Sequence, residues 1–245
     1  TCDGAGQLLG GLVSRKVVKQ PVMTSVYGVT LMGARDQVKR RLLELPAFQG
    51  DNVDERELKM VSLYLARVTL RSIGEVVRGA FDSMAWLRES ARTIALAGHA
   101  VEWESPLGLP VVQPYTKDHV RRVQTKLGTF RLVDGQGGSD EEVHKFRQVN
   151  GVAPNFVHTL DGTHMLMTAS ECRRRGITFA AVHDSYWCHA ADVDEMGDVL
   201  RKQFIDLHSA NLFEDLREQW YVKYGIRVEP PPERGELDLA KVKES

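Results

Sequence analysis

The sequence predicts a helix-rich α+β fold. Segments with apolar residues at helical spacing dominate the chain before residue 98, a short segment at 101–104 alternates apolar and polar residues, and an apolar run fills 177–182. With 245 residues, 42% of them hydrophobic, the chain can bury a substantial core as one large domain or two subdomains.

Five segments are expected to be helical because apolar residues recur every three to four positions. They cover residues 12–27, 35–45, 58–96, 156–175 and 194–207. Gly28 and Pro46 follow the first two segments and favour their ends there. Within the third, Gly74 and Gly79 are expected weak points, because glycine lowers helix stability.

Five shorter segments are expected to be strands because of their alternating or apolar character. They cover residues 101–104, 109–112, 129–133, 177–182 and 186–190. Ser105–Gly108 is typical of the turn of a first hairpin. The basic and polar stretch from Tyr115 to Asn150 is expected to leave the core, and Pro230–Pro232 predict an extended tail from Val228 onward.

Composition limits the kinds of partner. Thirty-two Lys and Arg balance 33 Asp and Glu, so a nucleic-acid-binding surface must be local. Basic runs occur at 39–41, 121–122 and 173–175, for which a solvated helix face is the simpler interpretation. Three distant cysteines predict neither disulfides nor zinc and fit a reducing compartment, and no apolar run approaches the roughly 20 residues that span a bilayer.

The first predicted helix carries the sharpest pattern. Arg15, Lys19, Met23 and Tyr27 are four residues apart and therefore form one stripe on a 3.6-residue helix. Two cations followed by a methionine and a tyrosine can hold a nucleotide, with its phosphates on the cations. On spacing alone the simpler interpretation is an amphipathic helix with two exposed cations and two packed residues.

A second pattern is His183-Asp184-Ser185, at the junction of two predicted strands. A carboxylate on such a junction is fixed and suits Mg²⁺, which prefers oxygen ligands. A hydrolase triad is excluded, because consecutive residues of extended chain point to opposite faces. A capped turn is the simpler interpretation of this tripeptide.

A third pattern places His158 and His164 on either side of Asp161 in a predicted helix. An imidazole beside an acidic residue can hydrogen-bond a ribose hydroxyl, whereas a histidine on a helix more often fills a packing role.

Taken in order, four blocks resemble the phage-type single-subunit RNA polymerases. Arg15–Gly28 resembles the fingers-helix motif of that family, commonly called motif B, nearly residue for residue. Pro106–Tyr115, Ala153–Met165 and Val182–Trp187 resemble later blocks in the same order. The resemblance spans about residues 10–239 and is strongest to the organellar branch of plants and algae.

The resemblance implies a right-hand polymerase fold. Residues 1–157 would be the fingers, including a specificity hairpin at about 113–150, and residues 158–245 the C-terminal part of the palm. The implied activity is that of a DNA-directed RNA polymerase, which transfers nucleotides from ribonucleoside triphosphates to an RNA 3′-hydroxyl in organellar transcription. Mitochondrial location is expected, with the plastid as the alternative.

The resemblance also implies roles for single residues. It assigns catalytic roles to Lys19, Asp184, Tyr27 and His183, and nucleotide contacts to Arg15, Lys19, Met23, Tyr27 and His158. Arg15 and Lys19 would bind the triphosphate, Tyr27 would lie by the sugar, and His158 would contact the 2′-hydroxyl. Asp184 would ligate Mg²⁺ in a two-metal site whose second carboxylate lies outside this sequence.

DNA contacts are implied for the cations of the specificity hairpin. They are Lys117, Arg121, Arg122, Lys126 and Arg131. The implied partners are the DNA template and promoter, the nascent RNA, the ribonucleoside triphosphates and organellar initiation factors, with no membrane segment.

Departures from the family pattern leave alternatives open. Because the sequence begins at Thr1 without a leader, and lacks the upstream aspartate and an aromatic C-terminal tail, we expect a fragment that alone is inactive. Pro21 inside the first helix is expected to kink it. A non-catalytic nucleic-acid-binding module, or one piece of a split polymerase, is the main alternative. A family A DNA polymerase is opposed by Met23 and Ser185.

Overall fold

The computed structural model is a helix-rich α+β structure, as predicted. It describes residues 14–25, 27–48, 54–117, 119–125, 128–134, 142–182, 185–235 and 238–244. Contacts divide the chain into two compact units, residues 1–85 and 86–245. Within the described ranges, no helix has both the length and the apolar character needed to cross a membrane.

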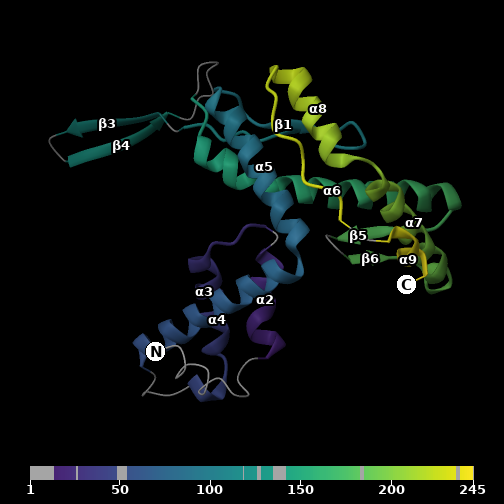
Figure 1. Cartoon of the computed structure of the whole chain (residues 1–245), viewed down its shortest axis with the longest axis horizontal. Coiled ribbons are helices and arrows are strands. Elements are labelled where there is room, and N and C mark those ends of the chain that lie inside the picture. Colours follow the sequence, from purple (N-terminus) through teal and green to yellow (C-terminus); the bar gives the residue numbers. More distant parts are fainter. Residues whose placement is uncertain are drawn as a thin grey trace. The chain divides into compact units, whose positions relative to one another are not determined.

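The regular elements in the described part of unit 1 are all helices, joined by turns (Figure 1). It contains α2 (Arg15–Ser25), α3 (Leu31–Leu42), the 3-10 helix η1 (Pro46–Phe48) and α4 (Glu55–Val76). Side chains cap the N-termini of α3 and α4: Thr30 Oγ1 accepts from Gly33 N at 3.1 Å and Asp54 Oδ1 from Arg56 N at 2.9 Å. Each cap satisfies a backbone donor that the helix itself leaves free.

The core of unit 1 forms where one face of each helix turns inward. The fully or nearly buried residues are Val17, Ala34, Val38, Leu42, Leu58, Val61, Leu65 and Ala66. On α3 the spacing of Ala34, Val38 and Leu42 is four residues, which places them on one stripe against α2 and α4.

The predicted helical region 58–96 is broken once. α4 ends at Val76 and α5 covers Arg78–Leu96, because Val77 adopts the non-helical angles φ −121° and ψ 47°. The break lies between Gly74 and Gly79, the two positions expected to be weak.

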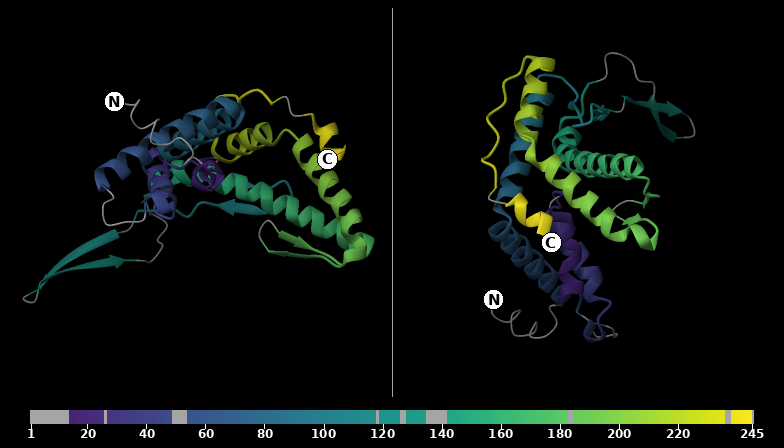
Figure 2. Two further views of the ribbon diagram at one scale, coloured as in Figure 1. Left: turned by 90° about the horizontal axis from the view of Figure 1, so that it is seen from below. Right: turned by 90° about the vertical axis from the view of Figure 1, so that its right-hand side faces the viewer.

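Unit 2 begins within α5, at Trp86, and contains three antiparallel two-stranded sheets (Figures 1 and 2). The pairs are β1 (Glu102–Glu104) with β2 (Pro110–Val112), β3 (His119–Thr125) with β4 (Gly128–Asp134), and β5 (Ala180–Val182) with β6 (Ser185–Trp187). The helices are α6 (Lys145–Arg175), the 3-10 helix η2 (Ala190–Asp192), α7 (Val193–Ser209), α8 (Leu212–Tyr224) and α9 (Leu239–Glu244).

Aromatic rings join α5, α6 and α8 in unit 2. Trp86 lies with its ring centroid 5.4 Å from Phe213 and 5.9 Å from Trp220. Phe156 of α6 is 5.7 Å from Phe213 and 6.1 Å from Trp103 of β1. Burial of such large rings is a major source of stability, so α8 belongs to the core of this unit.

Two expectations about unit 2 were wrong. α6 begins at Lys145, and not at residue 156 as expected. The helix includes Gly151 and Pro154, two residue types that usually weaken a helix. The sequence also gave no helix for 212–224, where α8 lies. The predicted boundary between fingers and palm, at 157/158, lies within α6 and stays a prediction.

Candidate functional site

The stripe predicted from the sequence exists on α2 of unit 1. Arg15, Lys19 and Met23 are exposed, while Val17, Pro21 and Ser25 are buried at the same four-residue spacing. A step of two residues turns an α-helix by about 200°, so the two triplets occupy opposite faces. The buried triplet faces the core of unit 1, and the cationic triplet faces solvent.

Exposure separates the two interpretations of this stripe. An ordinary amphipathic helix would pack the methionine and the tyrosine, but Met23 is 58% exposed and Tyr27 is 37% exposed. Large apolar side chains at solvent next to unburied cations suit a ligand with both an anionic and a flat apolar part. Met23 and Tyr27 are thus more exposed than the packing interpretation of the stripe expects.

Tyr27 lies just beyond the helix. α2 ends at Ser25, and Tyr27 N donates to Thr24 O at 3.1 Å in the turn that follows. Gly28 closes this turn with φ 78°, a left-handed conformation that glycine adopts without strain. The predicted helix over 12–27 is thus two residues too long at this end, and Tyr27 lies in the turn that follows the helical stripe.

Pro21 does not interrupt α2. The helix continues through it to Ser25, and the proline ring is buried. Thr24 Oγ1 lies within hydrogen-bond distance of Gln20 O, at 2.9 Å, and of Gln37 Oε1, at 3.0 Å, and the second contact connects this turn of α2 with α3.

The cations of α2 differ in their partners. Lys16 forms an ion pair with Glu44 at 3.1 Å, and this contact, with that from Arg41, lowers the pKa of the Glu44 carboxyl. Among the described residues, no carboxylate lies within ion-pair distance of Arg15 or Lys19. The described part of unit 1 thus leaves these two charges available to an anion.

Unit 2 holds the other residues of the resemblance. His158 is exposed on α6, one turn after Asn155. His164, six residues further on, is half-buried with Nε2 3.0 Å from Leu200 O and its ring against Phe204. His164 therefore fills a packing role, whereas the side chain of His158 lies at the surface of α6.

His183 and Asp184 lie outside the described residues. The strands on either side, β5 and β6, pair antiparallel up to Val182 and Ser185. A carboxylate at this junction is an oxygen donor of the kind that Mg²⁺ prefers. Among the described residues, no group of three or more His, Cys, Asp or Glu is placed to hold a metal.

The predicted DNA-binding cations lie on and around β3 and β4. Arg122 and Arg131 are partners in the antiparallel register, and Arg121 pairs with Leu132. Lys126 lies outside the described residues. Lys117, at the base of the hairpin, forms an ion pair with Glu142 at 2.6 Å.

Sequence analysis missed a polar network at the base of this hairpin. Gln113 and Gln148 are both fully buried and hydrogen-bond each other, and Asn155 and Tyr115 extend the network. No local pattern in the sequence indicates this network, because Gln113 and Gln148 are 35 positions apart and meet only through the fold.

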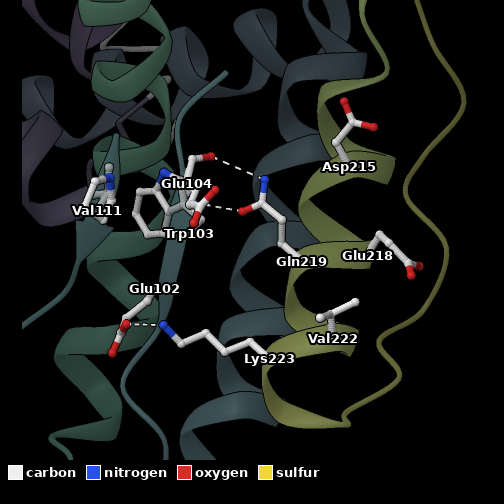
Figure 3. A pocket seen from close by; sticks show the side chains of 10 residues that line it. Glu102, Trp103, Glu104, Val111, Asp215, Glu218, Gln219, Val222 and Lys223 are labelled. Atoms are coloured by element: carbon white, nitrogen blue, oxygen red, sulfur yellow. Dashed lines mark hydrogen bonds and ion pairs between the residues drawn. The ribbon is translucent and has the colours of Figure 1, made fainter. Parts of the chain in front are cut away.

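A groove of about 490 Å³ also lies in unit 2, between the β1–β2 hairpin and α8 (Figure 3). The backbone N–H of Glu104 in β1 donates to Gln219 Oε1 at 2.8 Å, and Lys223 forms an ion pair with Glu102. Asp215 and Glu218 add two further carboxylates to the lining. Four carboxylates against one lysine disfavour a nucleic-acid phosphate backbone in this groove.

Comparisons with known proteins give the family. The model of the DNA-dependent RNA polymerase family matches residues 3–229. The chain is 47% identical over 240 residues to DNA-directed RNA polymerase 1, mitochondrial, of Nicotiana sylvestris, which covers 98% of this chain and 23% of that protein. It is 48% identical to DNA-directed RNA polymerase 3, chloroplastic, of the same plant, and the match covers 98% of this chain and 24% of that protein. It is 47% identical to DNA-directed RNA polymerase 2A of Nicotiana tabacum, and that match covers 98% of this chain and 70% of that protein.

Proposed function

This chain belongs to the DNA-dependent RNA polymerase family, and from that premise we propose that it contributes to template-directed RNA synthesis in an organelle. The chain spans 23% of the length of the mitochondrial relative, so the activity is proposed for the protein that carries it. The names of the relatives support a mitochondrion or plastid as the place. DNA, RNA and ribonucleoside triphosphates are the corresponding partners.

One observation carries the proposal: the exposed stripe of Arg15, Lys19 and Met23 opposite the buried face of α2. Charge-assisted hydrogen bonds from two cations suit a triphosphate, and the apolar side chain of Met23 and the ring of Tyr27 suit a base or sugar. We assign the triphosphate to Arg15 and Lys19 and the sugar to Tyr27. Unit 1 thereby supplies the nucleotide-binding part of a right-hand polymerase, the fingers.

Unit 2 supplies the ribose and metal functions in this proposal. His158 hydrogen-bonds the 2′-hydroxyl from the exposed face of α6, and Asp184, beside His183, is the palm carboxylate. Asp184, with a second carboxylate outside this sequence, would hold Mg²⁺, which would supply charge stabilisation for attack of the RNA 3′-hydroxyl on the α-phosphate. The β3–β4 hairpin, with its five cations, contacts promoter DNA as the specificity hairpin.

The assignment of subdomains follows the same logic. Residues 1–157 are proposed as fingers, including the specificity hairpin, and residues 158–245 as palm. This boundary divides α6 by function: the part before His158 anchors the hairpin, and the part from His158 onward carries the ribose contact.

The deciding experiment measures nucleotide addition by the full-length protein on a primed RNA–DNA hybrid, with Asp184→Asn as the variant. We expect the native protein to extend the RNA with ribonucleotides and the variant to lose at least ~10³-fold in rate, since a metal ligand is removed. Equal rates would sink the proposal and favour a non-catalytic module. Preference for deoxyribonucleotides would identify a DNA polymerase instead.

A further inference from the structure

The segment that carries β3 and β4 returns to its starting point in unit 2. We name residues 115–144 the arm. At its base His144 N donates to Tyr115 O at 2.9 Å and Lys117 N donates to Glu142 O at 2.8 Å, and Thr116 bridges antiparallel to Val143. The two ends of the arm are thus held together by backbone bonds, and its strands form a sheet of their own. Contacts at this base therefore contribute to the orientation of the arm on unit 2.

Gln148, in the first turns of α6, uses every hydrogen-bonding position of its amide, and one of its four bonds goes to Tyr115 at the base of the arm. Its Oε1 accepts from Val101 N at 3.1 Å and from Gln113 Nε2 at 3.0 Å. Its Nε2 donates to Gln113 O at 2.8 Å and to Tyr115 O at 3.3 Å. An amide offers two donors and two acceptor positions, so the side chain is saturated although it is fully buried.

Gln113, also fully buried, completes the network toward the next turn of the helix. Its Oε1 accepts from Asn155 Nδ2 at 2.9 Å, and the same Asn155 amide donates to the hydroxyl of Tyr115 at 3.2 Å. Leaving a buried amide without partners costs about 1–3 kcal/mol, so a tilted arm that breaks these bonds is disfavoured.

Gly151 lets the arm approach α6 this closely. A Cβ atom at this position would lie 2.7 Å from Tyr115 Cε2 and 2.8 Å from Gln113 Oε1, closer than real contacts allow. Glycine is otherwise unfavourable inside a helix, by about 0.5–1 kcal/mol relative to alanine. Its place here is explained by the contact with the arm.

We propose that Gln113, Gln148, Gly151 and Asn155 form a clamp that fixes the arm on α6. They act as positioning residues for DNA recognition, since they hold the hairpin that contacts DNA without touching DNA themselves. The inference rests on the proposed function for its consequence in transcription, while the clamp itself is a property of this chain alone.

The clamp is tested with two matched glycine variants of α6, Gly151→Ala and Gly162→Ala. A Cβ at Gly162 meets no atom within 4 Å, so both variants gain the same helix propensity and only one disturbs the clamp. Hydrogen–deuterium exchange of the Lys117 and His144 amides should be ~10-fold or more faster in Gly151→Ala than in the native protein, and unchanged in Gly162→Ala. Unchanged exchange in both variants overturns the clamp.

The consequence is tested in the full-length protein. Initiation on double-stranded organellar DNA, with the 5′ ends of the transcripts mapped, is compared with extension of a preformed RNA–DNA hybrid. For Gly151→Ala we expect initiation at native start sites to fall ~10-fold while extension stays within ~2-fold. Equal loss in both assays would show a general structural role and overturn the positioning role.

A second substitution keeps the test decisive if Gly151→Ala does not fold. Gln148→Met keeps the volume and removes the amide, and it should give the same split between the two assays. If the native protein extends no hybrid, the proposed function fails, while the exchange measurement still decides the clamp.

Discussion

Trp220 of α8 donates its indole Nε1–H to the carbonyl oxygen of Glu102 in β1 at 2.9 Å. One turn later the hydroxyl of Tyr224 donates to Ala100 O at 2.8 Å and accepts from Glu102 N at 3.1 Å. Because Trp220 is also completely buried, α8 is bound to this strand by both packing and hydrogen bonds. Its stability is therefore coupled to that of the β1–β2 hairpin.

Trp220→Phe tests this coupling. The ring remains in the core, but the Glu102 carbonyl loses its donor, so the free energy of unfolding should fall by about 1–2 kcal/mol. The matched control is Trp187→Phe, because Trp187 is 52% exposed and should change stability by less than ~0.5 kcal/mol. Urea titration followed by circular dichroism measures both. Equal values would show that the indole bond adds nothing.

The two cations of the α2 stripe should act on nucleotide affinity. Lys19→Ala, and separately Arg15→Ala, should raise the KM for ribonucleoside triphosphates about tenfold or more in the full-length protein, because each loses a charge-assisted bond. Lys16→Ala is the control: it removes a cation from the same helix that already pairs with Glu44. If the KM rose equally for Lys16→Ala, nucleotide binding would not depend specifically on Arg15 and Lys19.

The opposite faces of α2 predict opposite effects. Val17 is fully buried, so Val17→Ala should lower the free energy of unfolding by roughly 1–3 kcal/mol. Met23 is 58% exposed, so Met23→Ala should leave stability within ~0.5 kcal/mol while weakening nucleotide binding. Thermal unfolding and nucleotide titration of both variants separate the two roles. Destabilisation by Met23→Ala would mean that it packs after all.

How much could be predicted from sequence depended on the kind of signal. Periodicity found α2, α3 and α7, since each buries one regular stripe. It missed α8, whose buried residues Leu216 and Trp220 are only two positions in a helix rich in charged residues. The length of α6 was underestimated because Gly151 and Pro154 predict a break, and tertiary contacts with the arm overrule that preference.

The candidate site shows the same limit. The stripe of Arg15, Lys19 and Met23 could be predicted because helical geometry alone brings residues four apart together. The network of Gln113 with Gln148 could not, because their pairing depends on the fold that returns the arm to α6. A sequence thus predicts which residues share a face of one helix, but it does not predict hydrogen bonds between polar side chains that are far apart in the chain.

The basic run at 173–175 predicts a specific pH dependence. Hydrogen bonds from Arg174 and then Arg175 lower the pKa of Glu171 from its ordinary value of 4.5 to about 2. A lowered carboxyl pKa stabilises the folded state above the unfolded value, and this contribution is lost as pH falls from 4.5 to about 2. Glu171→Gln should therefore flatten the acid-unfolding profile in that window, with no effect on its shape at neutral pH. A profile identical to that of the native protein would contradict the pairing.

The two histidines of α6 offer a matched test of ribose recognition. His158 is exposed, and its replacement by alanine should lower the preference for ribonucleotides over deoxyribonucleotides about tenfold, the effect of one lost hydrogen bond to the 2′-hydroxyl. Stability should hardly change, because the side chain is at the surface. His164→Ala removes the same group from a half-buried position bonded to Leu200 O, so it should destabilise the fold by about 1–2 kcal/mol and leave sugar preference intact. The measurement is kcat/KM for a ribonucleotide and its deoxy counterpart in the full-length protein, beside a thermal melt. If His164→Ala shifted the sugar preference and His158→Ala did not, the ribose contact would have to be reassigned to the other face of α6.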